Sequence, residues 1–217
     1  MKYFTSDSHL GHTNILKLGA GRPFRDLAHM HSIFLKNAWD VVGPDDDLYH
    51  LGDAAMGNFD DTIKLLAAFP GRNKFLVPGN HDKIFPGLNT VSRIERFTPM
   101  YEDAGYTILE LHPLITLEAD GESFEVRLSH IPYSPERYTG RSDKLAFARP
   151  IDDGKWLIHG HTHSSDKLSD NPREIHVGVD ANDWTPVSEL TIIEQIRKAG
   201  QVKSSVKSKK NNSYLSF

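Results

Sequence analysis

The sequence contains no cysteine among its 217 residues. This absence excludes disulfide bonds, thiol nucleophiles and cysteine-ligated metal sites, and it fits a protein of a reducing compartment. The sequence also lacks any apolar run near the roughly 18 residues that a membrane span requires. Its N-terminal segment becomes polar too early for a secretory signal. We therefore expect a cytoplasmic protein that has no membrane partner.

An excess of positive charge is missing as well. There are 25 lysine and arginine residues against 29 aspartate and glutamate residues, so the formal net charge is -4. A dedicated nucleic-acid binder usually concentrates basic residues on one face, so a small or locally accommodated substrate is the better expectation. The length and the apolar content of 38% suit one domain, which we place at residues 1–200. We expect residues 201–217, rich in serine and lysine, to form a flexible basic tail, either solvated or in contact with phosphate or an acidic partner.

The first half of the chain alternates short strands with amphipathic helices. The pattern predicts strands at residues 2–5, 47–51 and 74–77, a helix at 27–42, and a second helix capped by Asn58. Strands that alternate with helices indicate a right-handed parallel βαβαβ core.

The second half is predicted to consist of antiparallel strands. Residues 119–122 form a turn signal between two of them, and a last helix is expected to begin near Pro186. The predicted strands span residues 106–111, 114–118, 123–128, 155–158 and 174–179. The chain is therefore assigned to the α/β class, with α+β character in this half.

Polar clusters follow most of the predicted strands. The most conspicuous is His-Gly-His-Thr-His at residues 159–163, which taken alone a histidine-rich turn explains equally well. Strand alternation predicts that His159 points away from the other two imidazoles. The carboxyl ends of parallel strands line one crevice, so clusters that are distant in sequence can meet there. The other clusters are Asp7-Ser8-His9, Gly52-Asp53, Gly79-Asn80-His81-Asp82 and Ser129-His130.

These clusters supply oxygen and imidazole donors but no sulfur. Seven donors exceed what one tetrahedral zinc ion takes, and they suit two divalent ions that share a carboxylate. Such a ligand set favours divalent ions such as manganese, iron, zinc or nickel without choosing among them. Manganese is our expected ion, with iron, zinc and nickel as alternatives. The seven candidate metal ligands are Asp7, His9, Asp53, Asn80, His130, His161 and His163.

The ordered set Asp-x-His, Gly-Asp, Gly-Asn-His-Asp, Ser-His and Gly-His-Thr-His, spread over residues 5–163, resembles the signature of calcineurin-like metallophosphoesterases. The resemblance implies a four-layer αββα sandwich, in which helices flank two mixed central sheets. It also implies two metal sites that share Asp53 as a bridge. One site would take Asp7, His9 and His163, and the other would take Asn80, His130 and His161.

The resemblance also implies roles for two residues outside the ligand set. His81 would hydrogen-bond the transferring phosphoryl oxygen and protonate the leaving group, while metal-bound hydroxide attacks the phosphorus in line. Asp82 would orient His81. Its carboxylate would also raise the pKa of the imidazole, and the protonated imidazole could then donate to the leaving oxygen. Further downstream, the segment with Asp180 and Asn182 resembles one found in small bacterial and phage-type members, where we expect these two residues to brace the site loops.

Four further residues are candidates for contact with substrate. His12 could touch substrate or orient a ligand, but it could equally be a polar residue at the start of a helix. Arg22 could bind phosphate through its planar fork of donors, and loop packing is the alternative. Tyr133 and Arg137 lie in the long connection 131–154, which is either a substrate lid or a plain surface loop.

The sequence therefore predicts a metal-dependent hydrolase of phosphomonoesters or phosphodiesters that acts on a small phosphoester such as a nucleotide. A nuclease is the alternative enzyme, although the acidic net charge speaks against DNA or RNA as a partner. A non-catalytic scaffold of the same fold is the other alternative, although a scaffold need not retain all seven ligand candidates and His81. The sequence does not indicate an oligomeric state.

Overall fold

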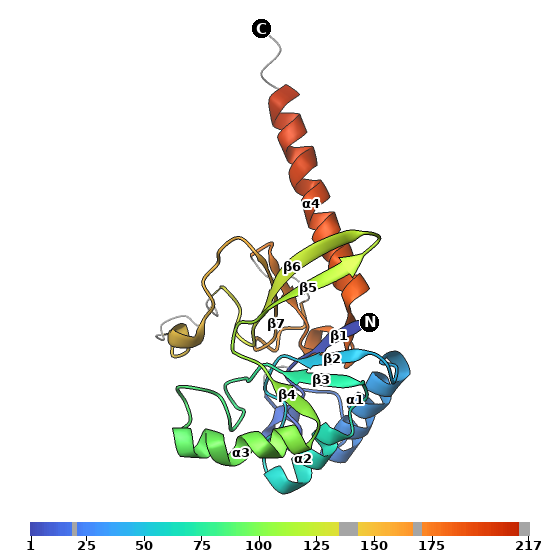
Figure 1. The fold of residues 1–217 in the computed structure, drawn as a ribbon. Coiled ribbons are helices and arrows are strands. Elements are labelled where there is room, and N and C mark those ends of the chain that lie inside the picture. The colour runs from blue at the N-terminus through green and yellow to red at the C-terminus, as the bar shows by residue number, and fades with distance from the viewer. Residues whose placement is uncertain (19–20, 135–142, 167–170, 213–217) are drawn as a thin grey trace.

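The computed structural model describes residues 1–18, 21–134, 143–166 and 171–212, with the backbone alone from residue 201 onward. Two β-sheets form the centre of the fold, and three helices cover the outer face of the first sheet (Figure 1). This α/β arrangement of two mixed sheets and four α-helices matches the expected αββα sandwich. The described residues also form short 3-10 helices, which are labelled η1 (Thr13–Leu16), η2 (Ala146–Ala148) and η3 (Val179–Ala181).

The first sheet contains the predicted parallel core. Its strand order is β4-β3-β2-β1-β9, in which the first four strands are mutually parallel and β9 runs antiparallel to β1. The strands are β1 (Lys2–Thr5), β2 (Asp47–His50), β3 (Asn73–Leu76), β4 (Tyr106–Ile108) and β9 (Val187–Ser188). The covering helices are α1 (Leu27–Val41), α2 (Phe59–Ala67) and α3 (Val91–Asp103).

The second sheet has the order β5-β6-β7-β8. Strands β5 (Leu114–Ala119) and β6 (Glu122–Leu128) form the predicted hairpin. Strands β7 (Trp156–His159) and β8 (Glu174–His176) instead run parallel to β6, so the prediction of an antiparallel second half is wrong for them. As a result, β6 and β7 both end at the same edge of this sheet.

Several boundaries differ from the sequence-based expectation. Strand β4 joins the first sheet rather than the second, and helix α3 was not expected at all. Asn58 stands at the N-cap of α2, but its side chain donates to Asp61 instead of capping the helix. Pro186 precedes β9, and the last helix, α4 (Glu189–Asn212), starts after that strand.

The predicted tail coincides with the end of α4. The helix continues through residue 200 to Asn212, so the backbone of residues 201–212 is helical, whereas residues 213–217 lie outside the described part of the chain. The expected flexibility of the tail stays a prediction. Within the described residues, no helix is both long and apolar enough to cross a bilayer.

A buried apolar cluster joins the two sheets. Phe4 and Tyr49 of the first sheet stack on each other, and they share this cluster with Leu117 and Ile158 of the second sheet and Ile193 of α4. Full burial of one such side chain contributes about 1.5–3 kcal/mol to the free energy of unfolding, so this cluster fixes the two sheets in position relative to each other. The strand ends that carry the polar clusters are thereby fixed against one another.

Candidate metal centre

The ligand candidates lie just after the carboxyl ends of strands from both sheets. Asp7 and His9 follow β1, Asp53 follows β2, and Asn80 follows β3. The second sheet contributes its candidates after two parallel strands, with His130 behind β6 and His161 and His163 behind β7. The parallel order explains the convergence, because parallel neighbours end at one edge.

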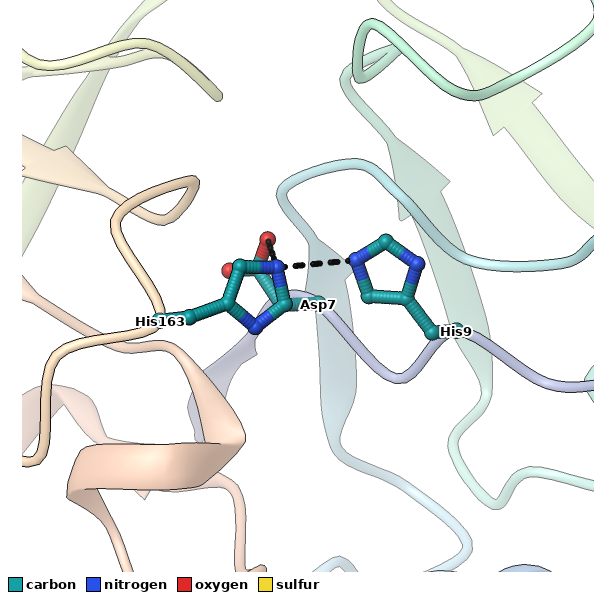
Figure 2. A group of neighbouring side chains, drawn as sticks. All are labelled: Asp7, His9 and His163. Carbon is teal, nitrogen blue, oxygen red and sulfur yellow. Dashed lines mark hydrogen bonds and ion pairs between the residues drawn. The ribbon is translucent and has the colours of Figure 1, made fainter. Parts of the chain in front are cut away.

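The first group consists of Asp7, His9 and His163 (Figure 2). The Nε2 atoms of the two imidazoles lie 3.0 Å apart, and His163 Nε2 lies 3.8 Å from Asp7 Oδ1. One ligand atom from each residue therefore fits around a single point, as a bound cation requires.

The second group surrounds the ring of His130. Its Nε2 atom lies 3.1 Å from Asn80 Oδ1, 3.2 Å from His161 Nδ1 and 3.4 Å from Asp53 Oδ2. The carboxylate of Asp7 can also join Asp53 and His130 around one point. All four candidates that the resemblance assigned to this site are thus in contact.

Asp53 connects the two groups. Its Oδ2 atom lies 3.5 Å from His9 Nε2 and 3.4 Å from His130 Nε2. The side chain is 1% exposed, so the carboxylate has no access to bulk water that would screen its charge. This position between the groups is the one that a bridging carboxylate would occupy.

The hydrogen bonds of two imidazoles leave electron pairs that point into the cluster. His163 Nδ1 donates to Asp180 Oδ2 at 3.0 Å, and His130 Nδ1 donates to the carbonyl of Leu51 at 2.8 Å. In the neutral tautomers, the Nε2 atoms of both rings therefore carry lone pairs that point into the cluster. In addition, Asp7 Oδ1 is buried and has no hydrogen-bond partner. Such lone pairs and an orphaned carboxylate oxygen are stabilised by cations, so the residues fit divalent metal ions.

The backbone is strained at the same residues. Five of the seven candidates have positive φ angles, a region that residues other than glycine rarely adopt. Each such residue costs about 1–3 kcal/mol, and strain of this kind collects at functional sites. The five φ angles are 61° at Asp7, 46° at His9, 53° at Asp53, 74° at His161 and 50° at His163.

The electrostatics of the cluster favour positive charge between the carboxylates. Burial alone would raise the pKa of Asp7 and of Asp53, but neighbouring imidazoles, foremost His130, hold the pKa of both carboxyls below the ordinary value. Burial opposes protonation of His130, yet the charge of Asp53 raises its pKa to about 9. Burial lowers the pKa of His9 to about 3, which keeps this imidazole in the neutral form that ligates metals.

Asp82 has a different role from the one that the resemblance implied. Its carboxylate accepts hydrogen bonds from the backbone N–H groups of Asp53 and Gly79, both at 2.8 Å, and from that of Ala54 at 3.1 Å. Tyr101 Oη also donates to it, at 3.2 Å. Burial, together with the charge of Asp53, raises the pKa of Asp82 to about 6. Because its acceptor positions are filled, Asp82 ties the loops after β2 and β3 together instead of orienting the ring of His81.

His81 stands at the open side of the cluster. Its backbone N–H donates to Asp53 Oδ1 at 2.8 Å, and its Nε2 atom lies 3.9 Å from Asp53 Oδ2. The side chain is 48% exposed and lines a cavity of about 670 Å³ next to His9 and His163. It can therefore reach a molecule in this cavity.

The four substrate-contact candidates lie in different surroundings. His12 lines the cavity, and its ring centroid is 5.4 Å from that of His9. Arg22 borders the cavity, but its guanidinium is buried and donates to Asp180, which is the packing role that was the alternative. Tyr133 is not among the residues that line the cavity, and its hydroxyl donates to the carbonyl of Lys155. Arg137 lies outside the described residues.

The predicted braces of the site are confirmed. Asp180 accepts from both Arg22 and His163, and Asn182 donates to the carbonyls of His176 and Gly178. His159 is buried with its ring stacked on His176, away from the ligand groups, as strand alternation predicted.

Two contacts behind the ligand loops were not found from the sequence. Ser8 Oγ lies 2.8 Å from His50 Nε2, between the ligand candidates Asp7 and His9 in the chain. Thr162 Oγ1 lies 3.4 Å from His176 Nε2, between the ligand candidates of the other loop. In both cases a hydroxyl residue stands between two ligand candidates in the sequence, and this position was the available signal.

The fold and the cluster together define an α/β protein with a buried aspartate and histidine site suited to metal ions. The chain belongs to the calcineurin-like phosphoesterase family, whose model matches residues 3–165. The resemblance noted in the sequence is thereby confirmed, and the site is of the kind that is typical of this family.

Relatives occur in phages and archaea. The chain is 36% identical to the Gene 66 protein of Mycobacterium phage L5 over 202 residues, which cover 82% of this chain and 86% of that protein. It is 27% identical to the uncharacterised protein MJ1445 of Methanocaldococcus jannaschii, covering 93% of this chain and 94% of the other. Among solved structures, the protein of unknown function AQ665 from Aquifex aeolicus superposes with a TM-score of 0.61 at 30% identity, covering 89% of this chain and 98% of that chain.

Proposed function

We propose that the chain is a hydrolase that cleaves phosphomonoesters or phosphodiesters and uses two divalent ions, one at each ligand group. The observation that carries this proposal is the position of Asp53 Oδ2, 3.5 Å from His9 Nε2 and 3.4 Å from His130 Nε2. A carboxylate placed in this way can serve both groups, which is the arrangement that a pair of ions requires.

The bound ions would act as Lewis acids on the phosphoryl oxygens and would lower the pKa of a water molecule. The residues of the chain supply the rest of the chemistry. Asp7 and Asp53 provide the negative charge that retains the ions. His81, half-exposed at the cavity, donates a hydrogen bond to the phosphoryl oxygen and a proton to the leaving oxygen.

The expected substrate is a small phosphoester, such as a nucleotide, and manganese is our expected ion. A cavity of about 670 Å³ lies within the usual size range of small-molecule sites. The net charge of -4 gives no electrostatic advantage to DNA or RNA, so a nuclease is the less favoured alternative. We expect the protein to act in the cytoplasm.

The test is a turnover assay on metal-free protein reconstituted separately with Mn²⁺, Fe²⁺, Zn²⁺ or Ni²⁺. The substrates are p-nitrophenyl phosphate, its bis ester, cyclic nucleotides and single-stranded DNA. We expect metal-dependent hydrolysis of at least one small ester and a metal content of two ions per chain. The variant Asp53→Asn, which removes the charge shared by the two ligand groups, should lose both the hydrolysis and the content of two ions. Two bound ions without turnover on any substrate would show a non-catalytic scaffold, and cleavage of DNA alone would show a nuclease.

A further inference from the structure

The cavity beside the metal centre has one polar side and one apolar side. The polar side includes His9, His81 and His163, and the apolar side is formed by Ile15, Leu18 and Trp184. We propose that this cavity selects phosphoesters that carry one phosphate group and a flat, weakly polar organic group of the size of a nucleobase. This inference rests on the proposed function, because the metal centre must hold the phosphate.

The apolar side begins one helical turn away from the ligands. The ring of His12 lies 5.4 Å from the ring of His9, and His12 is the N-cap of η1, which carries Ile15. Leu18 follows this short helix and is 54% exposed. A single exposed leucine needs no explanation, but this one shares a concave surface with Ile15 and with an indole from another part of the chain.

Trp184 reaches the same surface from the loop after η3. Its ring stacks on Phe34 with an interplanar angle of 13°, and the guanidinium of Arg22 lies 5.7 Å from its centroid. That guanidinium is 3.5 Å from His163 Nδ1, so only one side chain separates the indole from a ligand candidate.

The backbone holds Trp184 in an unfavourable conformation. Its φ angle is 60°, and that of the preceding Asp183 is 51°. Asn37 stabilises this turn, since its amide donates to the carbonyls of both residues at 3.3 Å. Strain that the surroundings maintain at a cavity wall marks a residue whose position is needed.

Among the described residues that line the cavity, no lysine or arginine side chain is free to bind a second phosphate. A guanidinium has five N–H donors, and those of Arg22 are directed at Asp180, the carbonyls of Asp7 and Ser8, and Met30 Sδ. The described residues that line the cavity include no lysine and no other arginine. The walls therefore favour apolar and stacking contacts over a further anionic group.

The test compares phosphate esters that differ either in the organic group or in the number of phosphate groups. Isothermal titration calorimetry with Mn²⁺-loaded protein measures binding of thymidine 5′-phosphate, methyl phosphate and thymidine 3′,5′-bisphosphate. We expect thymidine 5′-phosphate to bind at least about tenfold more tightly than methyl phosphate, because stacking of one base typically increases affinity by about this factor. The second phosphate of the bisphosphate should add no affinity. Leu18→Ala should reduce the preference for thymidine, whereas Leu114→Ala, which truncates a leucine of similar exposure on β5, should retain it.

A turnover assay separates this inference from the proposed function. p-Nitrophenyl thymidine 5′-phosphate and methyl p-nitrophenyl phosphate release the same leaving group, so their kcat/KM ratio reports on the organic group alone. Equal binding of thymidine and methyl phosphates, or an equal loss of both in Leu18→Ala, would overturn the inference even if hydrolysis occurs. A thymidine preference in binding without hydrolysis of any ester would support the inference and overturn the proposed function.

Discussion

His9 and His163 approach each other with their Nε2 atoms 3.0 Å apart, although 154 residues separate them in the chain. The Nδ1 proton of His163 is directed at Asp180, and Nδ1 of His9 faces Met56 Sδ at 3.1 Å. In the neutral tautomers that carry their protons on Nδ1, both facing atoms are acceptors, and their proximity is unfavourable without a positive charge between them.

Metal ions should therefore stabilise the fold. At an ion concentration 100 times the dissociation constant, one site adds about 2.7 kcal/mol to the free energy of unfolding. For a chain of this length, that corresponds to a rise in Tm of about 5–10 °C. Differential scanning calorimetry of chelator-treated protein, before and after addition of Mn²⁺, measures this shift. The shift should be absent in Asp53→Asn, and a wild-type Tm that none of Mn²⁺, Fe²⁺, Zn²⁺ and Ni²⁺ changes would contradict the metal site.

Replacement of His81 by alanine should reduce turnover without loss of metal. The ring lies at the open side of the cluster and is not needed to fill either ligand group, so metal content should match that of the wild type. Loss of a proton donor typically lowers kcat by about 10²–10⁴-fold. Steady-state kinetics and metal analysis on the same preparation measure both quantities, with His29→Ala in α1 as the control. Unchanged kcat would remove His81 from the mechanism.

Asp180→Asn should weaken metal binding. Asp180 accepts the Nδ1 proton of His163, and loss of such an outer partner typically lowers metal affinity by about 10–100-fold. Asp183→Asn is the matched control, because this exposed residue lies three positions further on and has a φ angle of 51°, which asparagine tolerates. Competition with a chromogenic chelator measures the affinities. Equal affinities in the two variants would mean that the contact with Asp180 does not position His163.

Gly160→Ala should destabilise the protein, although the φ angle of this glycine is not positive. An added Cβ would lie 1.9 Å from Ser6 Oγ, 2.6 Å from Ser6 Cβ and 2.5 Å from Asp7 Oδ2. Rotation of the Ser6 side chain cannot relieve the contact with its Cβ. We therefore expect the free energy of unfolding, measured by urea denaturation, to fall by about 1–3 kcal/mol. Gly200→Ala in α4 is the control. Nothing lies within 4 Å of its added Cβ, and alanine in a helix should gain about 0.5–1 kcal/mol.

The sequence predicted which ligand candidates meet in the two groups because each candidate lies in the loop that follows a strand. Strand ends are marked by the change from apolar residues to Gly-Asp or Gly-Asn-His, and parallel order then brings them to one edge. Helix α3 escaped prediction because Pro99 lies inside it and Tyr101 is its one fully buried side chain, so neither propensity nor periodicity indicated a helix.

The role of Asp82 could not be predicted for a different reason. Its partners include the backbone N–H groups of Asp53, Ala54 and Gly79, and a backbone group carries no sequence signal. The pairing of Arg22 with Asp180 spans 158 residues and depends on how the two loops fold back. Such contacts follow from the tertiary arrangement and are visible only in three dimensions.

The origin of the ligands in two separate sheets has a consequence for how the molecule assembles. Asp7 and Asp53 follow strands of the first sheet, whereas His130 and His163 follow strands of the second, so neither half alone completes a ligand group. An ion bound in either ligand group would have ligands from both sides of the molecule and would link the two sheets. We therefore expect metal to bind only after the two sheets have docked, and bound metal to slow their separation during unfolding.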